Sequence, residues 1–545
     1  MTPARWLSRP AADVRFRLLG AAAAGAALAA LVVPAANAGL ISPSTPACNW
    51  TMFGHDPGRS FAQPDGCSSV TRLSAPTLHP KWYFPTPDAA SASPAIVDGH
   101  LYIGDWGGNF YSFATDPPPG PVKPEWSFKV DDTSSVGFGR IVSSAAYAEV
   151  GGRKLVLFAG GATLYVLDAA NAGARVASAC VDPRADVDRC KTPGDQVEIL
   201  SSPAIVTESD GSTSVVVGMD VHNARDIGRT GIIKFSLTAD GSGVHLAPVW
   251  KFDPEARDAY TGSDMLTRGS GTGSGCGGVW GSPAVDVGKN LVFFGTASCS
   301  VNDGPDGPAD TTGEHVWGIA LDTGAMAWTY GPHIGILARY DDDFGGALNL
   351  LPGDRVGAGS KDGWYYVFDE RTGALAWPPV QVGQPGHATP GFAVGGVLAS
   401  PAVGKVNGED AIFLATAIST PNDKPLSNGP DTALPSVTQD PGRMFSLHAI
   451  RVSDGAILWR GPVSRQAYGP PTYVNGVVLV PSTFDFQIDA IDANTGLPLA
   501  ARPLPGPPSS APTPYGDSVY GGVGTSTGEG SPLAPLSGVY AFRVA

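Results

Sequence analysis

The chain has 545 residues, including 71 Gly and 50 Pro, and 43% of its residues are hydrophobic while only 16% are charged. This apolar content argues against a disordered chain, and the abundance of turn-forming residues is typical of many short strands. The formal net charge of -15 provides no excess of cations to neutralise a phosphate backbone, which argues against a nucleic-acid partner.

The N-terminal region has the pattern of a targeting segment. An apolar run from Leu18 to Val33 is followed by Ala36-Asn37-Ala38, a small-x-small cleavage site. Four arginines precede the run, namely Arg5, Arg9, Arg15 and Arg17. We therefore predict that residues 1–38 are a signal peptide and that the mature chain is secreted or extracytoplasmic, with no membrane span. An uncleaved membrane anchor is the alternative.

Residues 39–78 are predicted to be an extended lead-in to one domain at 79–545. The six Cys of an exported chain indicate disulfides. Six cysteines allow 15 connectivities. Pairing each with its neighbour in sequence gives Cys48–Cys67, Cys180–Cys190 and Cys276–Cys299.

The rest of the chain is an array of similar modules. Most modules begin with a Ser/Ala-Pro-Ala-Val-like strand, and turns such as Asp98-Gly99 separate it from the next strand. The predicted starts are Pro94, Ala145, Pro203, Pro283, Leu348, Pro401, Pro471 and Pro512. Large insertions are expected at about 206–275 and 418–441.

Each module predicts one four-stranded antiparallel sheet, which buries its faces only by stacking on its neighbours. A radial arrangement removes most exposed sheet edges. The last module lacks its fourth strand after Tyr540-Ala541-Phe542, and the stretch near Lys81-Trp82-Tyr83 is expected to supply it. We therefore predict an all-β, eight-bladed β-propeller, with seven blades as the alternative.

One phrase, Asp-x-x-Thr-Gly-x-x-x-Trp, recurs at the ends of modules. Its versions are Asp322 to Trp328, Asp369 to Trp377, Asp454 to Trp459 and a copy without Trp at Asp492 to Gly496. The phrase resembles the tryptophan-docking motif of quinoprotein alcohol dehydrogenases. Trp50-x-x-x-Gly54-x-Asp56-x-x-Arg59 also resembles the N-terminal signature of that superfamily, nearest the polyvinyl-alcohol dehydrogenase branch without its cytochrome module. The resemblance implies an eight-bladed propeller that binds pyrroloquinoline quinone (PQQ).

The resemblance also implies site residues. Trp280, in Gly277-Gly278-Val279-Trp280-Gly281, matches the indole beneath the quinone, where a flat cofactor needs a flat apolar face. Lys361 matches the cation that polarises the quinone carbonyl. The structural alternatives are a Trp packed between blades and a surface Lys in a hairpin turn.

Asp341 and Asp343, in Tyr340-Asp341-Asp342-Asp343-Phe344-Gly345, are the candidates for the base that takes the proton of a substrate hydroxyl. Adjacent carboxylates are expected to raise one another's pKa. A solvated acidic loop or a cation site is the alternative. His333, which lies upstream in the same segment, is interpreted with His222 and His315 as a structural or surface residue. Arg140 is interpreted as a loop residue or as an anion-binding group of the central channel.

Several departures leave the activity open. The family's calcium-binding Asn is replaced by Ser298, its Glu by Ser91 or Ser93, and its vicinal Cys pair is absent. Calcium is therefore an uncertain cofactor, since it prefers carboxylate and amide oxygens. The leading hypothesis is PQQ-dependent oxidation of a small or polymeric alcohol, with electrons passed to an external acceptor. The alternative is a non-catalytic propeller that binds a protein or polysaccharide.

Overall fold

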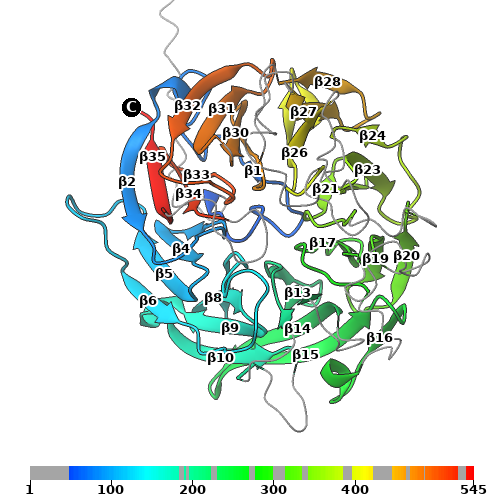
Figure 1. Cartoon of the computed structure of the whole chain (residues 1–545). Coiled ribbons are helices and arrows are strands. Elements are labelled where there is room, and N and C mark those ends of the chain that lie inside the picture. The colour runs from blue at the N-terminus through cyan, green and yellow to red at the C-terminus, as the bar shows by residue number, and fades with distance from the viewer. Residues whose placement is uncertain are drawn as a thin grey trace, which may run out of the picture. The chain divides into compact units, whose positions relative to one another are not determined.

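The computed structural model describes residues 48–182, 190–191, 196–222, 230–268, 276–298, 313–333, 342–383, 396–420, 445–461, 467–483, 485–525 and 536–545. These residues form eight β-sheets arranged as a ring (Figure 1). The prediction of an eight-bladed propeller is confirmed, and the seven-bladed alternative is wrong.

Within each blade the chain runs from the hub to the rim through antiparallel strands (Figure 1). The first blade contains β3 (Ala95–Val97), β4 (His100–Gly104), β5 (Asn109–Ala114) and β6 (Trp126–Lys129), and the second contains β7 (Ala146–Val150), β8 (Arg153–Gly160), β9 (Thr163–Asp168) and β10 (Ala174–Cys180). The third contains β11 (Gln196–Glu198), β12 (Ala204–Thr207), β13 (Thr213–His222), β14 (Gly231–Asp240), β15 (Gly243–Asp253) and β16 (Asp258–Tyr260). The fourth contains β17 (Ala284–Asp286), β18 (Leu291–Gly295), β19 (Val316–Ala320) and β20 (Met326–Tyr330).

The fifth blade contains β21 (Asn349–Leu351), β22 (Arg355–Gly359), β23 (Trp364–Asp369) and β24 (Val380–Gln381), and the sixth contains β25 (Ala402–Val406), β26 (Glu409–Thr420), β27 (Phe445–Arg451) and β28 (Ile457–Arg460). The seventh contains β29 (Thr472–Val474), β30 (Val477–Ser482), β31 (Gln487–Asp492) and β32 (Pro498–Pro503), with β1 (Ala62–Gln63) added beside β29. The eighth contains β33 (Thr513–Tyr515), β34 (Ser518–Val523), β35 (Gly538–Arg543) and β2 (His79–Pro85). Three 3₁₀ turns, η2 (Ala75–Thr77), η3 (Ala169–Asn171) and η4 (Met265–Thr267), complete the assigned elements. No helix among the described residues is long and apolar enough to cross a membrane.

In every blade one strand begins one residue after the predicted start, β12 being that strand in the third blade, and the recurring Ser before this strand links neighbouring blades. The backbone N–H of Ser93 donates to Ser144 Oγ at 2.8 Å, and that of Ser144 donates to Ser202 Oγ at 2.9 Å. The series continues from Ser202 to Ser282 Oγ at 2.8 Å, and in the last blade the backbone N–H of Ala511 donates to Ser93 Oγ of the first blade at 2.9 Å. The Ser of the repeat therefore provides a side-chain acceptor for a buried N–H that has no strand partner.

Residues 50–69 cross the hub and contact the innermost strands of all eight blades. Their backbone bonds run successively to Ile96, Tyr147, Val285, Leu350, Val403, Tyr473 and Gly516. In the third blade the contact comes from Arg59, whose Nη2 donates to Ser202 O at 3.1 Å. The Nε of Arg59 donates to Pro283 O of the fourth blade at 2.8 Å. Arg59 is fully buried, and this burial lowers its pKa to about 9, which leaves it charged at neutral pH.

Where the recurring phrase carries its Trp, the indole docks that blade onto the next. Trp377 Nε1 donates to Val452 O at 3.1 Å, and Trp459 Nε1 donates to Ala493 O at 2.9 Å. The repeat Gly of the next blade lies under each indole, so that a Cβ built on Gly455 would be 2.6 Å from the Trp377 ring. The motif thus pairs a Trp with a Gly one blade further along the chain, which explains why both recur.

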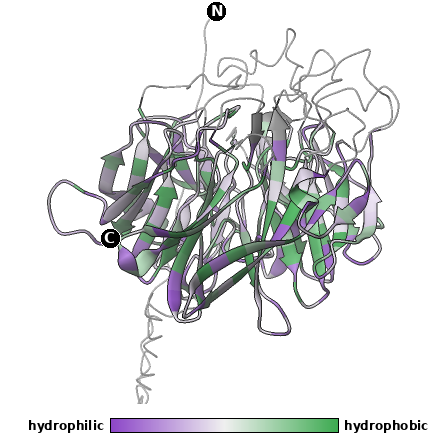
Figure 2. Ribbon diagram, turned by 90° about the horizontal axis from the view of Figure 1, so that it is seen from below, coloured by the Kyte–Doolittle hydropathy of each residue, from purple (hydrophilic) through white to green (hydrophobic). Residues whose placement is uncertain are grey.

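The apolar core is divided among the blade boundaries. Eight clusters of buried residues are formed, and each joins the facing surfaces of two neighbouring sheets. Hydrophobic residues accordingly run along the strands (Figure 2). Within the last blade, β2 pairs with β35 in antiparallel register as the fourth strand, with Trp82 opposite Ala541. The predicted closing strand is therefore present.

Two of the expected disulfides lie within the described residues. Cys48 is bonded to Cys67, and Cys180 is bonded to Cys190. Cys276 is also disulfide-bonded, whereas Cys299 lies outside the described residues.

The docking geometry predicts the cost of adding a methyl group at Gly455. Gly455 and Gly152 both have φ +77°, but a Cβ at Gly152 would meet nothing within 4 Å. Gly455→Ala should therefore lower the free energy of unfolding by about 2–4 kcal/mol, and Gly152→Ala by only about 1 kcal/mol. Urea denaturation of both variants measures the difference. Equal losses would contradict the role of the indole contact.

Candidate functional site

Three of the four predicted site residues meet where the fourth and fifth blades face each other. Trp280 lies just before β17, Asp343 lies before β21, and Lys361 lies in the turn between β22 and β23. The fourth, Asp341, lies outside the described residues. Residues up to 81 positions apart in the sequence (361 − 280 = 81) thus form one cluster because both blades project these loops toward the same boundary.

Asp343 is the centre of this cluster. Its Oδ2 accepts a hydrogen bond from Lys361 Nζ at 2.8 Å and another from Trp280 Nε1 at 3.0 Å. Its Oδ1 accepts the backbone N–H of Ser298 at 2.7 Å. The backbone N–H of Lys361 also donates to Asp343 O at 3.0 Å. These donors stabilise the charged carboxylate, whose side chain is 5% exposed.

Trp280 offers a flat apolar surface beside a cation. The Lys361 ammonium lies 5.6 Å from the centre of the Trp280 ring, within cation–π range. A Cβ built on Gly345 would come within 1.6 Å of the indole, so only Gly allows the ring to lie against this backbone. Trp280 is neither fully buried nor fully exposed. Trp280 lies at a blade boundary and Lys361 lies in the turn between β22 and β23, so the sequence alternatives of a Trp packed between blades and a Lys in a hairpin turn fit this geometry as well.

The two described residues of the acidic run have different partners. The Asp343 carboxylate contacts Lys361, whereas the backbone N–H of Asp342 donates to Glu314 Oε1 at 3.0 Å. The mutual effect of the carboxylates on their pKa stays a prediction, and Asp341 lies outside the described residues.

The positions that depart from the family's calcium ligands have other contacts. Ser298 contributes its backbone N–H to Asp343, Ser91 Oγ accepts from Trp106 Nε1 at 2.7 Å, and Ser93 belongs to the hub series. Within the described ranges, no group of three or more His, Cys, Asp or Glu side chains has a metal-binding arrangement.

Behind Asp343 and Lys361 lies a buried group that the sequence analysis did not identify. His333 Nδ1 is 3.0 Å from Glu314 Oε2, and His333 Nε2 is 3.0 Å from Asp362 Oδ2. The Tyr366 hydroxyl also donates to Asp362 Oδ2 at 2.7 Å. These residues carry no recognisable spacing, because the two carboxylates lie 48 positions apart in the sequence (362 − 314 = 48). The only signal was the position of His333 upstream of the acidic run.

The protonation of this group follows from its surroundings. Burial by itself lowers the pKa of His333, but hydrogen bonds with Asp362 and Glu314 outweigh it and raise the pKa to about 10. Burial raises the pKa of Glu314 to about 7, against the opposing effect of His333. The imidazole is therefore an imidazolium at neutral pH.

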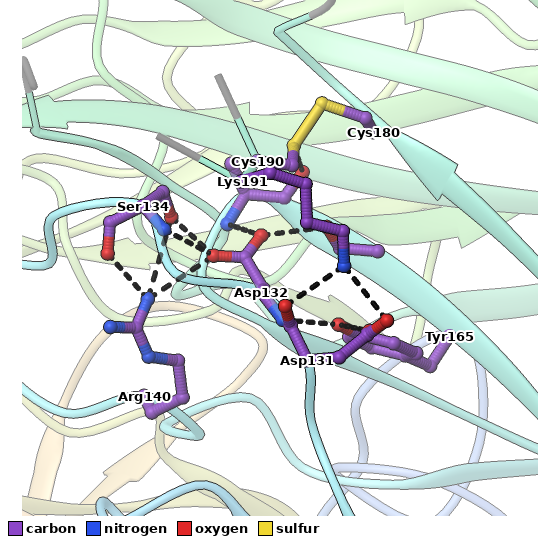
Figure 3. Close-up of a disulfide and its surroundings, with 10 residues drawn as sticks. Asp131, Asp132, Ser134, Arg140, Tyr165, Cys180, Cys190 and Lys191 are labelled. Atoms are coloured by element: carbon purple, nitrogen blue, oxygen red, sulfur yellow. Dashed lines mark hydrogen bonds and ion pairs between the residues drawn. A yellow bond between two sulfur atoms is a disulfide. The ribbon is translucent and has the colours of Figure 1, made fainter. Parts of the chain in front are cut away.

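Arg140, the candidate anion-binding residue, belongs to a separate polar cluster in the second blade (Figure 3). Arg140 Nη1 lies 3.1 Å from Asp132 Oδ1, which also accepts the backbone N–H of Ser134 at 2.9 Å. Asp131 pairs with Lys191, which adjoins the Cys180–Cys190 disulfide (Figure 3). This cluster borders a cavity of about 350 Å³. Arg140 is thus engaged by its own loop.

The chain belongs to a known family on the basis of this fold and sequence. Residues 50–394 match the family described as PQQ, "Glucose/ethanol/alcohol dehydrogenase, beta-propeller domain". A polyvinylalcohol dehydrogenase of Sphingopyxis sp. (strain 113P3) is 28% identical over 149 residues. That match covers 26% of this chain and only 20% of the relative, so it does not extend to the relative's whole length.

Solved structures support the same fold at low identity. A europium-containing methanol dehydrogenase superposes with a TM-score of 0.66 at 14% identity, covering 93% of this chain and 100% of the other. The quinohemoprotein alcohol dehydrogenase of Comamonas testosteroni gives a TM-score of 0.62 at 16% identity, covering 92% and 81%.

The His333 cluster predicts a pH dependence of stability. The folded-state pKa of His333 is raised above its ordinary value of 6.5 to about 10. Its contribution is therefore fully present below pH 6.5 and is lost as the pH rises through 10. The groups facing it are Glu314, Asp362 and the Tyr366 hydroxyl. The wild-type melting temperature should fall between pH 7 and 10 more steeply than that of His333→Gln. Parallel curves would contradict the imidazolium assignment.

Proposed function

We propose that this protein is an exported quinoprotein dehydrogenase that oxidises an alcohol with PQQ and passes the electrons to a separate acceptor. The observation that carries the proposal is the meeting of Trp280, Asp343 and Lys361 at one blade boundary. The family membership supports the reaction class, and disulfides are typical of an oxidising compartment.

The residues present fit PQQ. The partly exposed Trp280 indole rests on Gly345 and offers a stacking surface, and the Lys361 ammonium beside it provides a hydrogen-bond donor for quinone oxygens. When bound, PQQ supplies an ortho-quinone that accepts the two electrons of alcohol oxidation. The chain's contribution is to hold the ring plane and to place a positive charge at the accepting carbonyl.

The substrate proton requires a base at the same place. Asp343 is held as a carboxylate by three donors, which orients it but weakens it as a proton acceptor. We therefore assign Asp343 to orienting Lys361 and Trp280. Two residues are then candidates for the base that takes the proton: Asp343, once Lys361 turns to the quinone, and Asp341. Asp343→Asn and Asp341→Asn distinguish the two, because only the loss of the base removes turnover while cofactor binding is retained.

Calcium is left out of this proposal as a participant. Ser298 replaces the amide ligand expected from the resemblance, and it engages Asp343 through its backbone. Titration with Ca²⁺ is therefore included in the binding experiments as a variable.

A non-catalytic propeller that binds a protein or polysaccharide is the second candidate. It is favoured by the direct pairing of Lys361 with Asp343, because a cation already matched by a carboxylate is complete without a ligand.

Binding of PQQ separates these functions. Quenching of tryptophan fluorescence and quinone absorbance measure PQQ affinity for the purified mature protein, with and without Ca²⁺. Lys361→Ala should weaken binding about 10–100-fold, since it removes one charge-assisted hydrogen bond of about 1.5–3 kcal/mol. Lys405→Ala is the matched control, because Lys405 pairs with Asp410 on an exposed hairpin. Absence of micromolar binding to the wild type would reject the dehydrogenase and leave the binding propeller.

A further inference from the structure

The cluster behind the candidate site forms a closed circle of hydrogen bonds and ion pairs. Glu314 Oε1 accepts the N–H of Asp342 at 3.0 Å, and Ser360 Oγ donates to Asp342 O at 2.8 Å. The backbone N–H of Asp362 donates to Ser360 Oγ at 3.1 Å. His333, 3.0 Å from Asp362 and 3.0 Å from Glu314, completes the circle.

This circle includes the sequence neighbours of both charged site residues. Asp342 precedes Asp343, while Ser360 and Asp362 flank Lys361. The circle therefore holds the segment before β21 against the turn between β22 and β23. A change in its geometry moves the backbone of both partners of the Asp343–Lys361 ion pair.

We propose that His333 is a positioning residue of the candidate site. Through its two carboxylate partners it holds the segment that carries Asp343 against the turn that carries Lys361. This inference rests on the proposed function for its catalytic meaning, but its structural content is independent of PQQ.

The contacts of His333 suit this role. An imidazolium has two N–H donors in a fixed plane, so it can lie between two carboxyl groups and offset part of their negative charge. Phe344 stacks on its ring with centroids 6.2 Å apart, and the Tyr366 hydroxyl donates to Asp362 at 2.7 Å. Glu314 is held with φ +54°, a conformation uncommon for a residue other than Gly.

The first test requires no cofactor. Lysine side chains are acetylated with a limiting amount of an amine-reactive reagent, and mass spectrometry measures the rate at each lysine. The rate at Lys361 reports how firmly its ammonium is held in the ion pair. Lys361 is 13% exposed in the wild type and should react slowly. His333→Gln, which removes the charge and one donor, should increase the Lys361 rate several-fold and leave the exposed Lys405 unchanged.

A matched control separates positioning from general destabilisation. His448 is also fully buried, but it lies in β27 of the sixth blade. His448→Gln should lower the melting temperature without changing the Lys361 rate. If His333→Gln does not fold, Glu314→Gln breaks the same circle at another member and should raise the rate in the same direction. An unchanged Lys361 rate in a folded variant would overturn the inference.

The second test measures whether breaking the circle changes the affinity for PQQ. His333→Gln should weaken PQQ affinity about tenfold, as the loss of an orienting partner does elsewhere. In the Lys361→Ala background the same substitution should have little further effect, because the group it orients is gone. Full additivity would overturn the role. A faster Lys361 reaction without PQQ binding to the wild type would support the positioning role while rejecting the dehydrogenase.

Discussion

The fold depends on satisfying the backbone at the hub, where the first strands of all eight blades converge and have one side without a strand partner. A buried N–H left without an acceptor costs about 1–3 kcal/mol, so a ring with eight such edges requires a systematic solution. The Ser hydroxyls and the crossing segment 50–69 provide it. The recurring Ser-Pro sequence therefore marks the start of a strand and also provides the hydroxyl that accepts a hydrogen bond from the neighbouring blade.

The same arrangement explains why the candidate site lies between blades. Each sheet contacts its neighbours through a buried apolar layer, and the loops at its ends carry polar residues toward the adjacent sheet. Trp280 and Asp343 come from opposite sides of one such boundary. The rigid sheets fix the positions of the loops, and the loops provide the chemistry.

The fold was predictable because its determinants are local and repeated. The recurring phrase marks the docking contacts of Trp377 and Trp459, and the repeat strands follow their predicted starts closely. Trp280, Asp343 and Lys361 were indicated by resemblance, and the structure brings these three together. The circle through Glu314, His333 and Asp362 could not be predicted, since its members occur once each and come from separate loops. Residues that recur with no period and no fixed spacing cannot be recognised as a group in a single sequence.

The pairing of β2 with β35 has a consequence for synthesis. β2 is synthesised long before its partner β35, so β2 is an unpaired edge while the blades between them are being made. An incomplete chain of this kind is prone to pair with other chains. Its Lys81 side chain and two prolines, Pro80 and Pro85, make it a poor template for such pairing. Solubility during assembly is thus encoded in the strand that completes the ring.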